Sequence, residues 1–280
     1  MLDILRSEQF LDMAPPQVYT TLLDEGTYVG SVSTMYRLLR ENGEVRERRD
    51  QLTHPVYARP ELMAVRPNEL WSWDIAKLRG PLKGIYFYLY LVLDVFSRYV
   101  TGWTVQNCES QEIAKELINQ TCEKQQIEPG QLTIHADRGP SMIGKTIVDV
   151  MADLGVIKSH SRPHVSNDNP FSEAQFKTMK YRPEYPDRFG SIEEARAFAE
   201  VFVAWYNTLH YHSGIAMVTP EDMHYGRAGK VIDARACVLT AAQAAHPERF
   251  VRQHPVPQAL PSAVWINPPL ICGIVNNGTN

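Results

Sequence analysis

The sequence predicts an α/β fold with a mixed five-stranded sheet flanked by helices, preceded by a small helical domain. The first observation is a series of three β-branched and aromatic segments, Leu70–Lys77, Ile85–Val95 and Tyr99–Val105, close enough in sequence to pair antiparallel. The second is that helical and strand patterns alternate after them. The third is that the longest apolar run, Ile85 to Leu93, has nine residues. A bilayer span needs about 20, so we expect no contact with a membrane.

The alternating elements can be placed one by one. Ser110 is a suitable N-cap for a helix that runs to about Gln126. Leu132–Ala136 alternates in character and predicts a fourth strand. The remaining predicted elements are a helix over Ile143–Leu154, a strand over Val156–Ser161, a helix opened by Asn169-Pro170, and a helix from the capping box at Ser191-Ile-Glu-Glu to about Leu209. Three antiparallel strands followed by this alternation are the element order of the ribonuclease H-like fold.

Residues 1–43 predict a small helical domain. One helix is opened by Pro15-Pro16, and a second starts at Ser31. The inward positions of the second helix, at i, i+3, i+4 and i+7, are Val32, Met35, Tyr36 and Leu39. Arg37 and Arg40 fall on the opposite face, where they could contact DNA. This arrangement is typical of a helix-turn-helix, although a plain helical hairpin with a solvated face gives the same pattern.

The rest of the chain divides by composition. Residues 44–69 are rich in charge and punctuated by proline, which predicts a linker. Residues 70–227 hold the α/β core, and residues 228–280 hold a helix over Val231–Ala245 and a Pro-rich tail with a frayed end. The four cysteines form no CxxC pair, and no signal peptide is evident, so we expect reduced thiols in the cytosol.

Three acidic residues carry the functional prediction. Asp74 lies in the first strand, Asp137 follows the fourth, and Glu173 lies near the start of a helix, with 35 residues between Asp137 and Glu173. Separated carboxylates of this kind can hold a pair of divalent metals that clamp the attacking and leaving oxygens of a phosphodiester. A single acid at a strand end is more often structural, so the prediction rests on all three together. They are the predicted catalytic residues and metal ligands.

Two other acids could be the third member of this set. Asp94 ends the second strand, and Asp168 lies five residues before Glu173. We favour Glu173 because Lys177 and Lys180 lie four and seven residues after it, on the same helical face. There they could bind the phosphates of DNA, and ordinary helix-surface charge is the alternative.

Several polar residues near the acids are also candidates. Arg162 and His164 could contact phosphate, or they could belong to an ordinary surface loop. His135 shares its side of the strand with Asp137, and we expect it to hydrogen-bond behind the site rather than bind metal. Asn207 and His212 are expected to be structural. The net charge of −4 argues against a protein that coats DNA, so DNA binding must use local basic patches.

The motifs W-x-W-D-I, L-D-x-F-S-R, H-A-D-R-G, S-R-P-x-x-S-x-D-N-P-x-S-E-A-x-F-K-T-x-K and T-P-E-D resemble those of DDE transposases of bacterial insertion sequences. These enzymes share an integrase catalytic core with retroviral integrases. The resemblance covers residues 70–227 closely. The N-terminal His/Cys zinc site of retroviral integrases has no counterpart in this sequence, which favours the bacterial group.

This resemblance implies a transposase that uses two Mg²⁺ ions, or Mn²⁺ in their place, held by Asp74, Asp137 and Glu173. Water would cut a phosphodiester at the element's end, and the freed 3′-OH would attack a second one. The implied partners are the terminal inverted repeats, target DNA and further copies of the chain. The chain resembles a second-frame product, so an upstream-frame DNA-binding protein, separate or fused, is a further implied partner. The implied location is the bacterial cytoplasm, at the nucleoid.

Two other functions remain open from the sequence. The first is a DNA-binding or regulatory protein that lacks autonomous transposition because its upstream half is missing. The second is a ribonuclease H-like nuclease that acts on other substrates.

Overall fold

The computed structural model describes residues 1–10, 13–44, 60–137, 145–162 and 168–269. The chain divides into two compact units, Met1–Val56 and Tyr57–Asn280. The boundary falls inside the segment for which the composition predicts a linker.

The first unit is a small helical bundle built from α1 (Leu2–Leu5), α2 (Pro15–Asp24) and α3 (Val32–Glu41). Its buried core residues are Leu5, Phe10, Val18, Leu22 and Met35. Ser31 caps α3 as predicted, with its hydroxyl accepting a hydrogen bond from Thr34 N at 3.2 Å. Tyr36 was predicted to face inward but is 38% exposed, and its neighbour Met35 fills the core instead. Arg37 and Arg40 are exposed.

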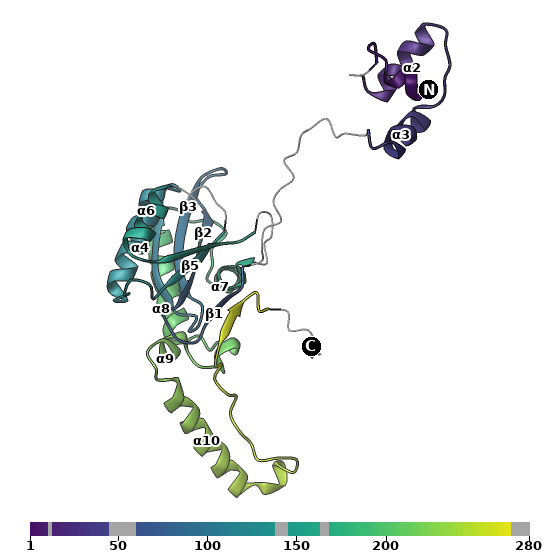
Figure 1. Ribbon diagram of the computed structural model, residues 1–280. Helices are drawn as coiled ribbons and strands as arrows, with labels where there is room; N and C mark the ends of the chain where they lie inside the picture. The colour runs from purple at the N-terminus through teal and green to yellow at the C-terminus, as the bar shows by residue number, and fades with distance from the viewer. Residues whose placement is uncertain (11–12, 45–59, 138–144, 163–167, 270–280) are drawn as a thin grey trace. The chain divides into compact units, whose positions relative to one another are not determined.

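The second unit is built around a five-stranded sheet with the order β4-β3-β2-β5-β6 (Figure 1). Its strands are β2 (Leu70–Arg79), β3 (Tyr86–Asp94), β4 (Val100–Gln106), β5 (Thr133–Ala136) and β6 (Ile157–His160). The strand β3 pairs antiparallel with both β2 and β4. On the other side, β5 pairs parallel with β2, and β6 pairs parallel with β5. The predicted mixed five-stranded sheet is therefore confirmed.

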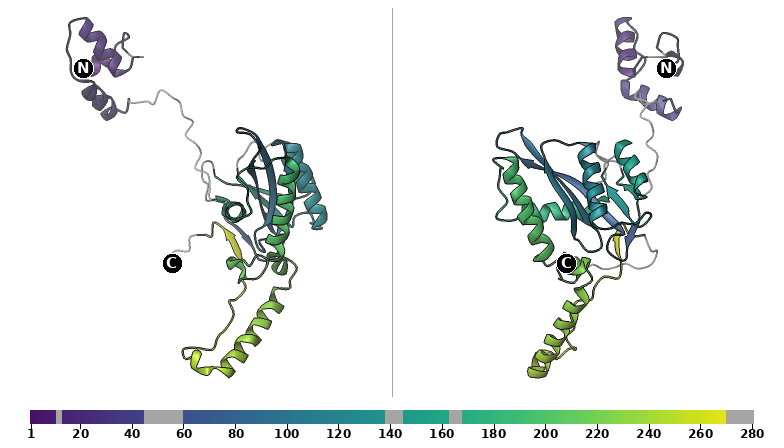
Figure 2. Two further views of the ribbon diagram at one scale, coloured as in Figure 1. Left: turned by 180° about the vertical axis from the view of Figure 1, so that it is seen from behind. Right: turned by 90° about the vertical axis from the view of Figure 1, so that its left-hand side faces the viewer.

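Helices cover both faces of the sheet (Figure 2). The helices α4 (Gln111–Lys124) and α6 (Lys145–Asp153) lie on one face, and α7 (Pro170–Lys180) and α8 (Ile192–Thr208) lie on the other. Along β2, Trp71 and Trp73 are buried toward α4, whereas Ala76 and Leu78 are buried toward α7 and α8.

This alternation fixes the register of β2. A slip of one residue would move both tryptophans to the opposite face of the sheet. An aromatic side chain buries about 200 Å², worth roughly 5 kcal/mol at about 25 cal/mol per Å². The burial of Trp71 and Trp73 therefore determines which face of the sheet Asp74 occupies.

The residues predicted to be structural are confirmed in that role. Asn207 on α8 binds both backbone groups of Val100 on β4, accepting from N at 2.9 Å and donating to O at 3.1 Å. His212 caps a short 3-10 helix, Ser213–Ile215, by accepting a hydrogen bond from Gly214 N at 3.1 Å. The short helix α9 (Pro220–His224) follows, capped by Thr219.

The two segments predicted as linker and tail meet in a small second sheet. In it, β1 (Leu62–Ala64) pairs antiparallel with β7 (Val264–Ile266). Ala64 and Ile266 are fully buried in a core that they share with Leu70 at the start of β2. The description of residues 44–69 as a linker is thus wrong for its last part, which belongs to the folded second unit.

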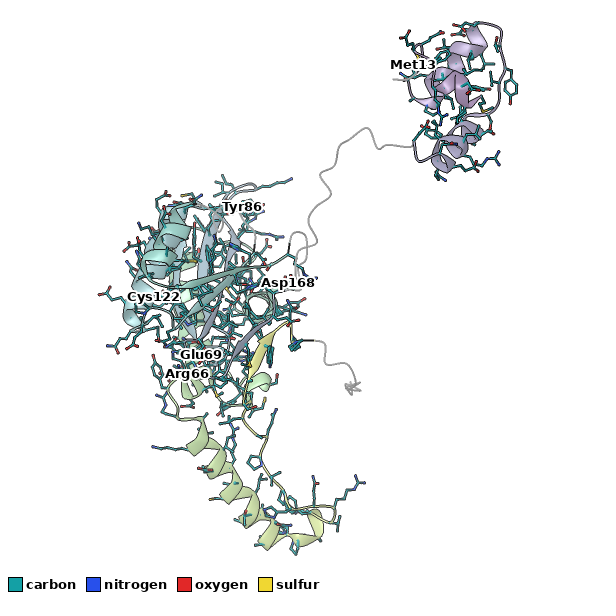
Figure 3. The ribbon with its side chains drawn as sticks, in the orientation of Figure 1. Met13, Arg66, Glu69, Tyr86, Cys122 and Asp168 are labelled. Carbon is teal, nitrogen blue, oxygen red and sulfur yellow. The ribbon has the colours of Figure 1, made fainter. Side chains whose placement is uncertain are left out.

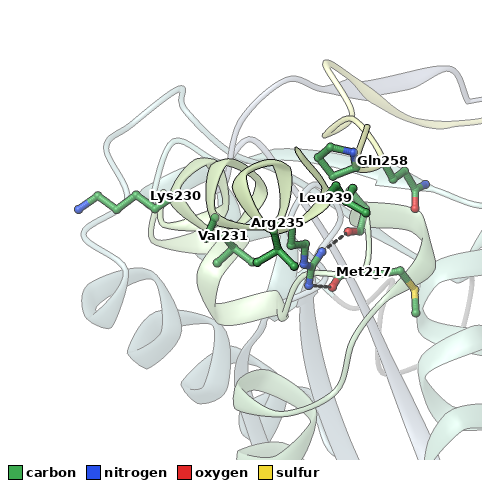
Figure 4. A pocket seen from close by; sticks show the side chains of 10 residues that line it. Met217, Lys230, Val231, Arg235, Leu239 and Gln258 are labelled. Carbon is green, nitrogen blue, oxygen red and sulfur yellow. Dashed lines mark hydrogen bonds between the residues drawn. The ribbon is translucent and has the colours of Figure 1, made fainter. Parts of the chain in front are cut away.

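The helix α10 (Ala228–Ala245) extends away from the sheet, and the chain returns along it (Figure 1). Between them lies an apolar hollow of about 730 Å³ (Figure 4), where Arg235 donates hydrogen bonds to the carbonyls of Ala216 and Met217 at 3.0 and 2.6 Å. None of the predicted site residues lines this hollow. Among the helices of the described ranges, none is long and apolar enough to cross a membrane.

Candidate active site

Strand pairing brings the first two acids together. The last paired residues of β2 and β5 are Trp73 and Ala136, so the residues that follow them, Asp74 and Asp137, are neighbours across the two strands. Both fall on the face of the sheet opposite Trp73 and Ala136, because successive side chains alternate between faces. That face is the one covered by α7.

The helix α7 brings the third acid, and its first turn is anchored to β2 by buried polar groups. The hydroxyl of Ser72 donates to the side-chain oxygen of Asn169 and lies 2.5 Å from the hydroxyl of Ser172. Asn169 occupies the predicted N-cap position, but its side chain makes no capping bond because it turns into the sheet. Glu173 lies in this anchored turn and is exposed.

The three carboxylates influence one another electrostatically. Burial raises the pKa of Asp74 to about 7, and repulsion from Asp137 and Glu173 adds to the rise, while the amide of Ile75 and the charge of Lys180 oppose it. Burial and the charge of Asp137 raise the pKa of Glu173. The site therefore concentrates negative charge where a cation would be favourable.

The three carboxylates nevertheless do not lie close enough together in this structure to bind one ion jointly. Within the described ranges, no three His, Cys, Asp or Glu side chains lie close enough together to hold a metal ion. One oxygen of Asp74 accepts a hydrogen bond from Ile75 N at 2.8 Å, and one of Asp137 accepts from the hydroxyl of Ser161 at 2.6 Å. By chemistry, three carboxylates are the oxygen donors that Mg²⁺ and Mn²⁺ prefer, so the donor set fits such ions.

A cavity of about 410 Å³ opens beside Asp74 and Glu173. Its other lining residues are Ile75, Ala76, Lys77, Phe176, Lys177, Lys180 and Tyr181. The cavity thus combines two acids with three lysines, and it includes the two lysines predicted to bind DNA. Sequence reasoning missed Lys77 and Tyr181. Tyr181 could have been noticed because it directly follows Lys180, at the end of a basic helical face.

Behind Asp137 lies a buried histidine. His135 is fully buried, and its ring nitrogens lie 3.0 Å from the hydroxyl of Ser159 and 2.8 Å from the carbonyl oxygen of Asp168. Ser161, which donates to Asp137, also lies 3.3 Å from His135. Burial lowers the pKa of His135. A neutral ring of this kind can hold the end of β5 and the start of α7 in position.

Asp168 forms an ion pair with Arg162 (Asp168 is labelled in Figure 3). The carboxylate accepts hydrogen bonds from the Arg162 backbone and guanidinium at 2.9 to 3.1 Å, and from the amide of Asn267 at 2.9 Å. Burial alone would raise the pKa of Asp168, but these donors outweigh it and lower the pKa to about 2. The carboxylate oxygens of Asp168 therefore already accept hydrogen bonds from Arg162 and Asn267. His164 lies outside the described residues.

Asp94, the other competing acid, is fully buried. It accepts hydrogen bonds from the backbone and the hydroxyl of Ser97 and from the backbone of Asn68, all at 2.7 Å. A carboxylate that is satisfied in this way holds the turn between β3 and β4 and the entry to β2.

The strand order and the helices on both faces define a ribonuclease H-like α/β protein. Two family models, both for the integrase core domain, match residues 64–166 and 154–220, and together they cover more than half of the chain. The chain belongs to the integrase-core family.

Several proteins similar to this chain are transposases. The transposase of insertion sequence IS904 from Lactococcus lactis is 30% identical over 173 residues, covering 59% of this chain and 66% of the relative. Transposase InsF of IS3A from Escherichia coli is 26% identical over 162 residues, covering 58% and 55%. The chain therefore spans less than two thirds of the length of these relatives.

Solved structures of retroviral integrases are also similar. One is the catalytic core of HTLV-2 integrase in complex with magnesium, which is 16% identical with a TM-score of 0.40. The match covers 57% of this chain and 98% of that one.

Proposed function

We propose that the protein is a DDE-type transposase, which cuts DNA strands at the ends of an insertion sequence and transfers them to target DNA. The observation that carries the proposal is the convergence of Asp74, Asp137 and Glu173 on one face of the sheet, where each of the last two raises the pKa of the first. The transposase relatives support the same reaction, although the chain spans only part of their length.

Asp74, Asp137 and Glu173 would hold the divalent metal, two Mg²⁺ ions with Mn²⁺ as a substitute. When bound, such ions stabilise the charge that develops on the attacking and leaving oxygens of the phosphodiester. The three carboxylates suit such ions for two reasons. Their oxygens are the donors that these ions prefer, and a cation relieves the repulsion between them. His135 acts as a positioning residue, since its ring lies beside Ser161, which donates to Asp137.

Positive side chains around this site would bind the DNA backbone. Lys177 and Lys180 line the cavity next to Glu173, and their charges suit a phosphate held beside the acids. Arg162 and His164 would contact the same DNA from the β6–α7 connection. Arg37 and Arg40, both exposed on α3 of the first unit, would add backbone contacts at the terminal repeat.

The proposed partners are the terminal inverted repeats, target DNA and further copies of the chain, because two element ends must be brought together. An upstream-frame DNA-binding protein, separate or fused, would supply affinity that a chain with a net charge of −4 lacks. The proposed location is the bacterial cytoplasm, at the nucleoid.

A strand-cleavage assay tests the proposal. A labelled duplex that ends in the terminal repeat flanking the gene is incubated with the full chain and Mg²⁺ or Mn²⁺. We expect nicked and joined products from wild type and from Asp153→Asn, which alters an exposed acid on α6, and none from Asp137→Asn. Equal product from Asp137→Asn would contradict the proposal. If wild type binds the repeat but yields no product, alone or fused to the upstream-frame protein, a regulatory role is favoured instead.

A further inference from the structure

Tyr181 is an exposed aromatic residue on the wall of the cavity that holds Asp74 and Glu173. It caps the C-terminus of α7, directly after Lys180, and 78% of its surface is exposed. Its side chain is absent from the hydrophobic clusters formed by the described residues, and its hydroxyl has no hydrogen-bond partner there. Neither packing nor hydrogen bonding of the fold therefore explains a tyrosine at this position.

The surroundings of this ring indicate what it could bind. The ammonium group of Lys177 lies 5.7 Å from the ring centroid, and Lys77 and Lys180 line the same cavity. An apolar protein partner would be poorly matched to three cations. An aromatic platform among cations that track a phosphate backbone is, by contrast, the usual arrangement for binding single-stranded nucleic acid.

The spacing along α7 also suits DNA. Glu173 and Tyr181 are separated by eight residues, which at about 1.5 Å per residue corresponds to roughly 12 Å along the helix. Successive phosphates of one DNA strand rise about 3.4 Å each, so the ring lies roughly three to four nucleotides from the acids. A base at that distance is close enough to be part of the same bound strand.

We propose that Tyr181 is a stacking platform for an unpaired nucleobase a few nucleotides from the phosphate held by the acids. This inference rests on the proposed function, in which a DNA strand is cut and joined to a second DNA, because base pairs beside a strand end can open. Extruded bases lose their stacking partners, and an exposed aromatic ring replaces that contact. Stacking depends little on which base is bound, so Tyr181 would favour unpaired ends of any sequence.

The test compares two probes that bind the full-length chain in the absence of divalent metal. One is a duplex with a single-stranded 3′ tail that carries 2-aminopurine, whose fluorescence falls when it stacks, and the other is the blunt duplex. We expect wild type to prefer the tailed probe roughly 5- to 100-fold and to quench it. Tyr181→Phe should keep both properties, and Tyr181→Ala should lose both.

Tyr211→Ala is a matched control. Tyr211 is 59% exposed and has a cation, Arg235, 5.8 Å from its ring, but it does not line the cavity. It should behave as wild type. The inference is overturned if Tyr181→Ala keeps the preference and the quenching, or if Tyr181→Phe loses as much as Tyr181→Ala, which would assign the effect to the hydroxyl.

This test is independent of the proposed reaction, because binding is measured without metal. If wild type cuts DNA while Tyr181→Ala still quenches the probe, only the stacking role fails. If wild type shows Tyr181-dependent quenching but no cleavage with Mg²⁺ or Mn²⁺, the stacking role is supported and only the proposed reaction fails.

Discussion

Asp74 and Asp94 lie on neighbouring strands of one sheet, yet their surroundings are opposite. Asp94 accepts three hydrogen bonds at 2.7 Å and is sealed from solvent. Asp74 borders an open cavity and faces two further acids. Burial raises the pKa of both, but hydrogen bonds from Ser97 and Asn68 counteract it at Asp94, whereas other carboxylates add to it at Asp74. An acid surrounded by donors stabilises the fold, whereas an acid held among acids indicates a site for a cation.

The largest expected effect is the loss of activity in Asp74→Asn. Strand cleavage should fall roughly a thousandfold or more, because the carboxylate is replaced by a neutral amide. The free energy of unfolding above pH 7 should stay the same or rise, because the folded state no longer holds a half-buried charge beside Asp137 and Glu173. The cleavage assay and urea unfolding measure the two effects. A variant that cuts normally, or one that is strongly destabilised, would remove the contrast with Asp94.

Asp94→Ala should have the opposite profile. It leaves the buried donors of Ser97 and Asn68 without an acceptor, so the free energy of unfolding should fall by about 3–5 kcal/mol. Asp153→Ala, at an exposed position, should stay within about 0.5 kcal/mol of wild type. Urea unfolding at neutral pH provides the measurement. A change at Asp94 as small as at Asp153 would show that its hydrogen bonds contribute little.

Asp168 provides an intermediate case, since its partners lower its pKa to about 2. An unfolded Asp titrates near 3.9, so this stabilisation is complete above about pH 4 and is lost as the pH falls toward 2. Asp168→Asn should therefore be less stable than wild type by about 2 kcal/mol at pH 6, and the difference should shrink below pH 4. Unfolding curves from pH 3 to 6 measure it. A difference that does not change with pH would mean that the charge of Asp168 is unimportant.

The smallest effect is expected at the lysines. Lys177→Gln removes one cation from the cavity wall, so the dependence of DNA binding on salt should weaken by a slope of about 0.9. Lys124→Gln, exposed at the end of α4 away from the cavity, should leave the slope unchanged. Fluorescence anisotropy at several salt concentrations gives both slopes. Equal slopes for the two variants would exclude Lys177 from the DNA contact.

Local patterns were sufficient to predict the central sheet. The aromatic and β-branched run of β3 was predicted as Ile85–Val95 and is observed as Tyr86–Asp94. The alternation in β5 correctly put Asp137 on the face opposite Ile134 and Ala136. Such patterns are readable because burial on each face is imposed residue by residue.

Contacts between distant segments could not be predicted in the same way. The strands β1 and β7 have three residues each and are separated by most of the chain, so neither has enough periodicity to identify it. The same holds for Asn267, which reaches Asp168 only because β7 returns to the second unit. The buried contact of Ser72 with Asn169 is also long-range, and it overrides the capping preference of an Asn-Pro start. The positions of the three acids in the strands and in α7 could be predicted from the sequence, whereas the residues that support them depend on tertiary packing.

Asp74, Asp137 and Glu173 are proposed to form one divalent-metal site. Isothermal titration of the full chain with Mn²⁺ tests this proposal most directly, with Asp74→Asn, Asp137→Asn and Glu173→Gln as variants and Asp94→Asn as the comparison. We expect Mn²⁺ binding by wild type and by the folded fraction of Asp94→Asn, and weak or no binding by each of the other three variants. Unchanged Mn²⁺ binding by Asp74→Asn, Asp137→Asn and Glu173→Gln, each shown to be folded, would contradict it.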